Sequence, residues 1–223
     1  MAYIYADNAA TTRLSDTAFD AMKPFLLEEY GNASTLYKLG RSAHKAVENA
    51  RGVFAKGINA LPAEIYFTSG GTESDNWAIK GTAHRLASCG KKHIVTDNIE
   101  HHAVLNSAKA LEREGFEVTC VSADKNGLVR AEDVAAAIRP DTALVSVMFA
   151  NNELGTIQPV AEIGSICRSA GVLFHCDAVQ AAGILPIDVK QMNIDLLSMS
   201  AHKFHGPKAV SYTHLRAHET PEH

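Results

Sequence analysis

Short apolar segments alternate with longer segments of helical periodicity along most of this 223-residue chain. The apolar segments have the length of β-strands and occupy residues 65–68, 94–96, 116–121, 142–149, 172–176 and 194–199. Helical patterns lie between them, over residues 73–86, 102–114, 132–138 and 160–169. Such an alternation is typical of βαβ units, in which helices cover both faces of a mostly parallel sheet. The sequence therefore predicts an α/β fold whose ligand site lies beyond the carboxyl ends of the strands.

The N-terminal part of the chain is less regular. Residues 3–5 have the composition of a short strand, and residues 31–34 that of a turn. Ser15 is suited to cap a helix, and a second amphipathic helix is predicted over residues 41–56.

The composition excludes several classes of protein. Hydrophobic content of 46% and charged content of 21% are those of an ordinary soluble domain. A formal net charge of −4 without a basic block argues against a nucleic-acid surface. Because no apolar run could span a bilayer and no signal peptide is apparent, we predict a cytoplasmic protein without membrane contact. The four cysteines show no C-x-x-C spacing and are expected to be free thiols.

A glycine-rich turn follows the first strand of the alternating region. Residues 69–76 include Gly70, Gly71 and Thr72 and lead directly into a helix. Glycines let backbone N–H groups approach an anion, and a helix N-terminus adds partial positive charge. The turn therefore suits a phosphate group, although a tight turn with Thr72 as the helix cap explains the same residues equally well.

Polar residues also follow later strands. His101 could stack on a flat ring or move protons, or it could simply cap a helix. Asn151 and Asn152 could bind a ring substituent or a carboxylate, or form an Asx turn. Asp177 ends an apolar strand and could pair with a pyridinium N–H, with Gln180 near the ring's phenolic oxygen; otherwise Asp177 is a helix cap.

Lys203 comes just after the last buried strand, at 194–199. A lysine that is partly desolvated has a lowered pKa and can form a Schiff base with an aldehyde cofactor, whereas the alternative is an ordinary surface lysine. Together the candidates specify one cofactor, pyridoxal 5′-phosphate. It would use a turn that binds phosphate, an imidazole that stacks on the ring, an aspartate that pairs with the ring nitrogen, and this lysine. A metal site is the competing use of nearby histidines and a cysteine, but their spacing is not of a zinc type. Those residues are His101, His102, His175, Cys176, His202 and His205.

Several motifs together resemble those of the cysteine desulfurases, which are pyridoxal-phosphate-dependent enzymes of the class V aminotransferase fold. The motifs are Asp7–Thr12, Gly31–Ser34, Thr68–Asn76, Glu100–His101, Asn151–Gly155, Asp177–Gln180 and Ser200–Pro207. The resemblance covers residues 3–209 and points to the nitrogen-fixation and iron–sulfur assembly branch. It implies the type I fold of pyridoxal-phosphate-dependent transferases.

The resemblance also implies a role for each site residue. Lys203 would bind the cofactor covalently and later move protons, with His101 stacked on the ring. Asp177 would pair with the pyridine nitrogen and Gln180 with the phenolic oxygen, while Asn152 would lie near the substrate carboxylate. The cofactor's phosphate would be held by Gly71, Thr72, Ser200 and His202.

The reaction implied by the resemblance converts L-cysteine to L-alanine. A separate catalytic cysteine would take the sulfur as a persulfide and pass it to an acceptor or scaffold protein for iron–sulfur cluster assembly. The full-length enzyme would be a homodimer. Two alternatives remain open: another class V enzyme, such as a selenocysteine lyase or an aminotransferase, and a non-catalytic fragment that binds pyridoxal phosphate.

The C-terminal end departs from the family pattern. Residues 210–223 show no strand pattern, and we predict a disordered tail outside the family fold. Residues 1–14 are expected to belong to a small domain and 15–209 to an incomplete large domain that binds the cofactor. The loop with the persulfide cysteine would then be missing, and the chain itself is predicted to be inactive.

Overall fold

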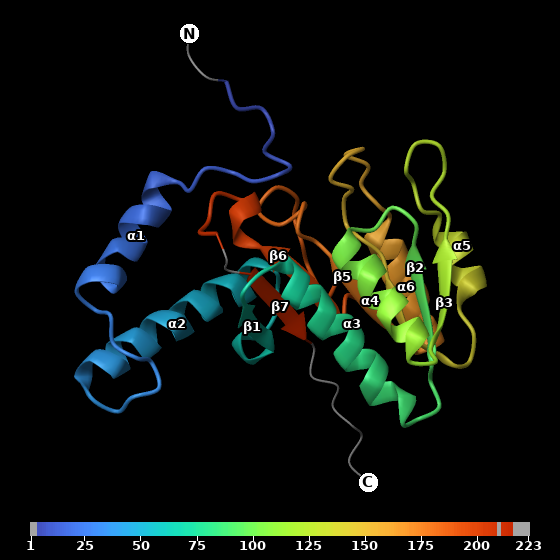
Figure 1. The fold of residues 1–223 in the computed structure, drawn as a ribbon, viewed down its shortest axis with the longest axis horizontal. Helices are drawn as coiled ribbons and strands as arrows, with labels where there is room; N and C mark the ends of the chain where they lie inside the picture. The colour runs from blue at the N-terminus through green and yellow to red at the C-terminus, as the bar shows by residue number, and fades with distance from the viewer. Residues whose placement is uncertain (1–3, 209–210, 216–223) are drawn as a thin grey trace.

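The computed structural model describes residues 4–208 and 211–215, which form one mixed sheet with helices packed on it (Figure 1). The strands are β1 (Ile65–Thr68), β2 (His93–Asp97), β3 (Glu117–Val121), β4 (Thr142–Ser146), β5 (Leu173–Asp177), β6 (Leu196–Ser200) and β7 (Ser211–Leu215). The helices are α1 (Asp16–Leu27), α2 (Lys38–Gly57), α3 (Gly71–Ala87), α4 (His102–Arg113), α5 (Ala131–Ala137) and α6 (Val160–Ala170). Two single turns of 3₁₀ helix, Pro62–Glu64 and Ala201–Lys203, complete the described elements.

The sheet has the strand order β1-β7-β6-β5-β4-β2-β3. The five strands from β6 to β3 are parallel, whereas β7 runs antiparallel to both of its neighbours, β1 and β6. The predicted α/β fold with a mostly parallel sheet is therefore confirmed. The carboxyl ends of β2, β4, β5 and β6 meet at one edge, which is where such a sheet binds ligands.

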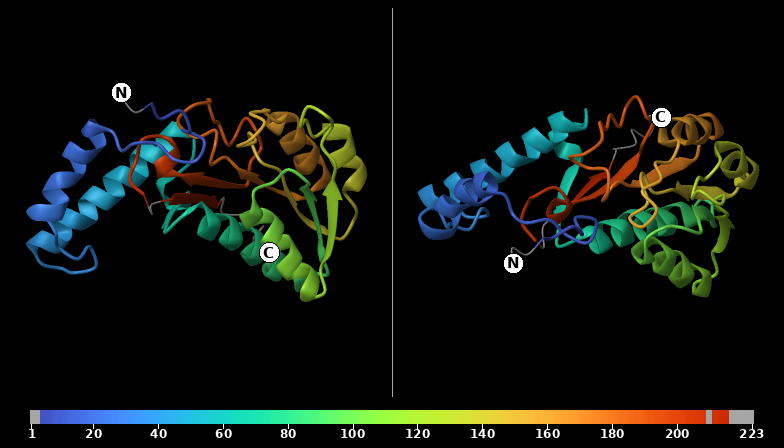
Figure 2. Two further views of the ribbon diagram at one scale, coloured as in Figure 1. Left: turned by 45° about the horizontal axis from the view of Figure 1, so that its top comes forward. Right: turned by 90° about the horizontal axis from the view of Figure 1, so that it is seen from above.

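Helices cover both faces of the parallel part of the sheet (Figure 2). Neighbouring strand residues point to opposite faces: Ile94 packs with α3 and α4, and Val95 packs in the other core, which includes residues of α5 and α6. The same alternation holds for Leu144 and Val145 of β4. The continuous apolar strands of the sequence thus reflect burial on both sides.

The first two helices project from the sheet as an arm, with α2 contacting the sheet at β1 (Figure 1). Ser15 caps α1 as predicted, because its Oγ accepts a hydrogen bond from the Ala18 N–H at 3.1 Å. Among the twelve residues of α1, all of them described, none is buried, and Phe19 and Phe25 are exposed. In the described part of the chain, no helix has the length and apolar character needed to cross a membrane.

The structure corrects several expectations. Ile4 and Tyr5 form no strand, and both side chains are exposed; Tyr3 lies outside the described residues. The strand predicted at 142–149 ends at Ser146, although Val147 and Phe149 still donate backbone hydrogen bonds to β5. The strand predicted at 194–199 begins at Leu196 and ends at Ser200.

The tail predicted to be disordered contains β7. Residues 211–215 pair with β1 on one side and with β6 on the other, with Thr213 opposite both Tyr66 and Ser198. The backbone N–H and C=O groups of both neighbours need partners, and an extended segment between them supplies these hydrogen bonds. The rest of the predicted tail, residues 210 and 216–223, lies outside the described residues, and the division into a small and a large domain stays a prediction.

Candidate functional site

A cavity of about 490 Å³ opens at the carboxyl ends of the parallel strands. Its lining includes every residue that the sequence predicted for the cofactor and substrate site. These are Gly71, Thr72, His101, Asn152, Asp177, Gln180, Ser200, His202 and Lys203. A larger cavity, of about 650 Å³, lies at the opposite ends of β4, β5 and β6 and contains none of them.

The glycine-rich turn forms the N-terminus of α3 at one side of the cavity. Gly70, not Thr72, occupies the N-cap position, so the interpretation of Thr72 as the cap is wrong. A Cβ atom on Gly71 would lie 3.1 Å from Val179 Cγ2 and 3.7 Å from Ser200 Cβ. A side chain would therefore crowd the cavity wall, whereas glycine leaves the first N–H groups of α3 accessible to an anion.

Asp177, the last residue of β5, forms the floor of the cavity on its buried side. Its Oδ1 accepts a hydrogen bond from the Val179 N–H at 2.9 Å, and only 5% of the residue is exposed. Residues 179–184 form turns and no helix follows Asp177, so the helix-cap interpretation of Asp177 is wrong. Burial raises the pKa of Asp177, while the hydrogen bond from the Val179 N–H and the positive charge of Lys203 act to lower it.

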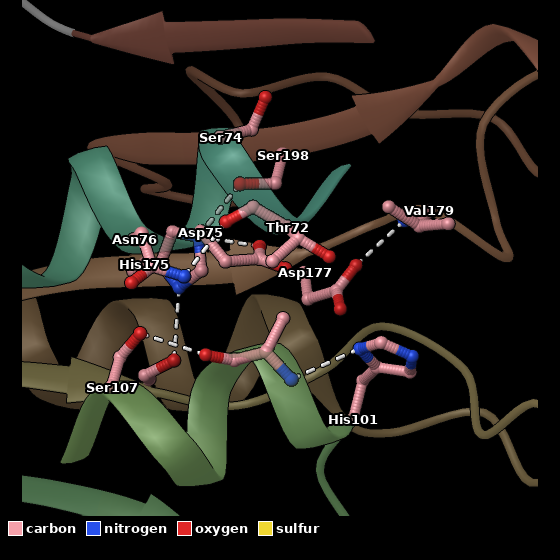
Figure 3. A network of polar contacts seen from close by, with 12 residues as sticks. Thr72, Ser74, Asp75, Asn76, His101, Ser107, His175, Asp177, Val179 and Ser198 are labelled. Atoms are coloured by element: carbon pink, nitrogen blue, oxygen red, sulfur yellow. Dashed lines mark hydrogen bonds and ion pairs between the residues drawn. The ribbon is translucent and has the colours of Figure 1, made fainter. Parts of the chain in front are cut away.

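A group of buried polar side chains lies beside Asp177 (Figure 3). The imidazole of His175 contacts Ser146 Oγ through Nδ1 at 2.9 Å and Ser198 Oγ through Nε2 at 3.0 Å. Burial lowers the pKa of His175 to about 3, so the ring is neutral at physiological pH. Asp75 on α3 faces the same ring, with Oδ1 3.7 Å from Nε2. Burial, followed by the charge of Asp177, raises the pKa of Asp75 well above its usual value.

Two further acidic side chains are buried near this edge of the sheet. Burial raises the pKa of Asp97 to about 7. Burial, followed by the charges of Asp97, Asp177 and Asp75, also raises the pKa of Glu100. Within the described residues, no group of three or more histidine, cysteine or acidic side chains is arranged to hold a metal ion. The edge therefore holds several carboxyls whose proton affinity is high.

His101 and Asn152 reach the cavity from two loops. His101 caps α4, because its Nδ1 accepts a hydrogen bond from the Ala103 N–H at 3.1 Å, and it also lines the cavity. That bond requires Nδ1 to be unprotonated, so in the neutral ring Nε2 carries the proton. Asn151, not Asn152, forms the Asx turn, since its Oδ1 accepts from the N–H groups of Glu153 and Leu154. Asn152 lines the cavity, whereas Asn151 maintains the loop.

Lys203 lies across the cavity on the single 3₁₀ turn that follows β6. Its Nζ donates to the carbonyl oxygens of Ala9 and Ala10, the latter at 3.0 Å. Burial lowers the pKa of Lys203, and the charges of Asp177 and Asp7 oppose this shift. This direction agrees with the prediction that the amine loses its proton more readily than an exposed lysine.

The sequence did not identify all residues of the cavity. Asp75 lies one helical turn after Thr72, and a charged residue on a helix face with Ala78 and Ile79 is a signal that could have revealed it. Ala9 and Ala10 contribute backbone carbonyls, which leave no signal in the choice of side chain.

The sequence model of the Aminotransferase class-V family matches residues 4–220. The chain therefore belongs to the class V aminotransferase family. Proteins of this family and the related cysteine desulfurases depend on pyridoxal 5′-phosphate.

Several curated relatives carry the name cysteine desulfurase IscS. The protein of Methanosarcina thermophila is 52% identical over 213 residues, which are 96% of this chain and 52% of the relative. That of Anaeromyxobacter dehalogenans is 53% identical over 214 residues, which are 96% of this chain and 53% of the relative. The chain thus spans about half the length of the curated relatives that it matches.

Solved structures give the same picture. A structure described as a NifS-like protein superposes with a TM-score of 0.94 at 42% identity, over 97% of this chain and 60% of the other. A structure of SspA in complex with cysteine superposes with a TM-score of 0.93 at 40% identity, over 96% and 61% of the two chains. The predicted resemblance to cysteine desulfurases is therefore confirmed.

Proposed function

We propose that this chain forms the cofactor-binding part of a pyridoxal-phosphate-dependent cysteine desulfurase, which converts L-cysteine to L-alanine and delivers sulfur for iron–sulfur clusters. The observation that carries the proposal is the convergence of all the predicted site residues on one cavity at the carboxyl edge of the sheet. Relatives named cysteine desulfurase, and a neighbouring structure that contains cysteine, support the choice of reaction and substrate.

The residues of the cavity fit the chemistry of this cofactor. When bound, pyridoxal phosphate supplies an electron sink that stabilises negative charge on a substrate carbon. Asp177 would present a buried carboxylate to the ring nitrogen, and Gln180 an amide to the phenolic oxygen. The N–H groups at the start of α3, with Thr72, Ser200 and His202, would bind the phosphate, in a space that a side chain on residue 71 would fill.

Lys203 and His101 are the groups suited to move protons. Lys203 would hold the cofactor covalently, and its Nζ would take up and return a proton whenever the amine is free. Nε2 of His101 carries a proton in the neutral ring, since the bond to the Ala103 N–H occupies Nδ1. Asn152 would orient the substrate carboxylate through its amide group.

The positions of the four cysteines indicate that the chain does not form the persulfide by itself. All four belong to the described residues, and none lines the cavity. Burial raises the pKa of Cys176, and that of Cys167 to about 12, so neither thiol forms the reactive thiolate readily. Cys89 and Cys120 are exposed away from the site. This placement favours the alternative in which the 223-residue chain binds the cofactor without turnover.

A homodimer and a sulfur acceptor complete the proposal. The exposed apolar side chains of α1 and α2 support association with a second copy, because such surfaces are usually covered in oligomers. They include Phe19, Phe25, Leu26, Leu27, Leu39, Val47 and Val53. Sedimentation of the purified chain, which reports its mass in solution, tests whether it forms a dimer. The acceptor protein and the cytoplasmic location stay predictions from the sequence.

Two measurements test the proposed function. Addition of pyridoxal phosphate should produce the visible absorbance of a lysine Schiff base, and Lys203→Ala should abolish it while Lys190→Ala, an exposed lysine, should not. Incubation with L-cysteine should release neither alanine nor sulfide catalytically. Failure of the wild-type chain to bind the cofactor would refute the proposal, and sustained turnover would refute the inference that none of its four cysteines forms the persulfide.

A further inference from the structure

The amine of Lys203 is held by main-chain atoms from the other end of the chain. Its Nζ donates to the carbonyls of Ala9 and Ala10, and the side-chain amide of Gln180 donates to the same Ala9 carbonyl at 3.0 Å. These carbonyls belong to residues 7–12, which we call the N-terminal turn. Two residues of the predicted cofactor site thus contact a segment that the predicted site did not include.

The N-terminal turn is fixed in place by its own hydrogen bonds. Thr12 Oγ1 donates to the His202 carbonyl at 2.9 Å and accepts from the His205 N–H at 2.7 Å. The Thr12 N–H also donates to the His202 carbonyl at 2.8 Å, and Thr11 Oγ1 contacts His202 Nδ1 at 3.0 Å. The turn and the loop that carries Lys203 therefore form one hydrogen-bonded unit. Thr12 is its centre, because one hydroxyl bridges both sides of that loop.

We propose that the N-terminal turn is a resting site for the Lys203 amine: the Ala9 and Ala10 carbonyls hold Nζ whenever it is not bonded to the cofactor, and Thr12 is the positioning residue that places these carbonyls. This inference rests on the proposed function, since it assigns Lys203 an attached and a detached state. It concerns the detached state, in which the lysine must stay beside the cofactor and not move into solvent.

Hydrogen-bond chemistry explains why carbonyls suit this purpose. A protonated amine has three donors and no acceptor, so a pair of carbonyl oxygens can bind it without adding a fixed charge. A carboxylate in the same place would form an ion pair and keep the amine protonated. Carbonyls therefore keep the amine in position while leaving its proton free to be transferred. Covalent attachment removes two of the donors, which releases the amine from the turn.

The rate at which the free amine reacts with a reagent measures this contact directly. We would treat the cofactor-free chain with a short pulse of acetic anhydride and quantify acetylation of each lysine by peptide mass spectrometry. Thr12→Val replaces the bridging hydroxyl with a methyl group of the same size. The turn then loses a net stabilisation of about that of one hydrogen bond, so the Lys203 amine is held less often. Lys203 should therefore be acetylated about fivefold faster or more. Exposed Lys190 in the same sample should react at an unchanged rate.

Two further variants serve as controls. Thr35→Val removes a hydroxyl that donates to the Asn32 carbonyl at 2.7 Å in a distant turn, and it should leave the rate at Lys203 unchanged. Thr12→Ser keeps the hydroxyl and should restore the wild-type rate. An equal rate at Lys203 in Thr12→Val and Thr35→Val would overturn the proposal. So would an equal rise at Lys190, which would mean general loosening of the fold.

A second measurement does not depend on the folding of Thr12→Val. Lys203→Met removes the donor and keeps an unbranched side chain, so amide hydrogen exchange in a peptide covering residues 6–13 should accelerate, while exchange in α6 stays unchanged. Unchanged exchange in residues 6–13 would overturn the proposal. Because these measurements use cofactor-free protein, a failure of pyridoxal phosphate to bind in a separate titration would refute the proposed function alone.

Discussion

Two walls of the same cavity are built in different ways. The acidic wall, Asp75 and Asp177, belongs to α3 and β5, is almost fully buried, and lies beside the buried polar group around His175. The lysine wall, Lys203 and the N-terminal turn, is half-exposed and consists of segments 190 residues or more apart in sequence joined by polar contacts. The packing of the sheet fixes the position of the acidic wall, whereas a few hydrogen bonds fix the position of the lysine wall.

The difference teaches how each wall can contribute to function. Burial fixes the position of the acids and alters their proton affinity, because water no longer solvates the charged form. Polar contacts at a half-exposed surface are individually weak and can exchange partners. The acidic wall is thus suited to hold a ring in one orientation, and the lysine wall to a group that attaches and detaches.

The largest effect is expected at Asp97, a buried acid that neighbours the acidic wall. Because burial raises its pKa to about 7, the folded state binds this proton more tightly than the unfolded chain. The protonated group contributes up to about 4 kcal/mol to the free energy of unfolding. This contribution is fully present below about pH 4 and is lost as the pH rises to about 7. Asp97→Asn should flatten this loss in urea unfolding of the cofactor-free chain measured across that range.

An aspartate that is only partly exposed provides the matched control. Asp124 accepts hydrogen bonds from the N–H groups of Leu128 and Asn126, which lower its pKa, so its contribution has the opposite sign and is lost as the pH falls. Asp124→Asn should leave the decline between about pH 4 and pH 7 in place. A decline of equal size in Asp97→Asn and in the wild type would show that the acids are not desolvated as described.

Asp177→Asn should produce the next largest effect. The amide keeps the shape of the side chain and the acceptor for the Val179 N–H but cannot form a charged hydrogen bond with a ring N–H. The dissociation constant of pyridoxal phosphate should rise by about tenfold to a hundredfold. Equilibrium titration measures it, and thermal unfolding of the cofactor-free variant should show no loss of stability. Unchanged affinity would contradict the role given to this carboxylate.

Gly71→Ala should have the smallest effect of the three. Its new Cβ would lie 3.1 Å from Val179 Cγ2, so the first turn of α3 would have to shift slightly from the phosphate position. We expect the affinity for pyridoxal phosphate to fall by about threefold to tenfold. The matched control is Gly70→Ala, where the new Cβ meets no atom within 4 Å and the backbone is extended. Equal affinities of the two variants would show that Gly71 is not part of the cradle.

Sequence patterns predicted one part of each wall, Asp177 of the acidic wall and Lys203 of the lysine wall. Asp177 was recognisable because it ends an apolar strand, and a charge there requires a partner. Asp75 was missed, although it carries a charge on the buried face of a helix, next to Ala78 and Ile79. The carbonyls of Ala9 and Ala10 could not be predicted, because backbone atoms are common to all residues and only the fold brings them to Lys203.

The fold itself was largely predictable for a similar reason. Strands such as β2 and β5 are buried on both faces, and burial selects continuous apolar residues that are visible in the sequence. β7 was missed because the run Ser-Tyr-Thr-His-Leu is mostly polar, and its pairing depends on the edges that β1 and β6 present. The individual roles of the residues in the cavity stay predictions, since they concern a molecule that binds there.

The proposed function depends above all on Lys203 being the amine that receives the cofactor. The most direct measurement is to incubate the chain with pyridoxal phosphate, reduce the adduct with borohydride and locate it by peptide mass spectrometry. The phosphopyridoxyl group should be found on Lys203 at one equivalent or less. An adduct spread over exposed lysines such as Lys190, with none at Lys203, would contradict it.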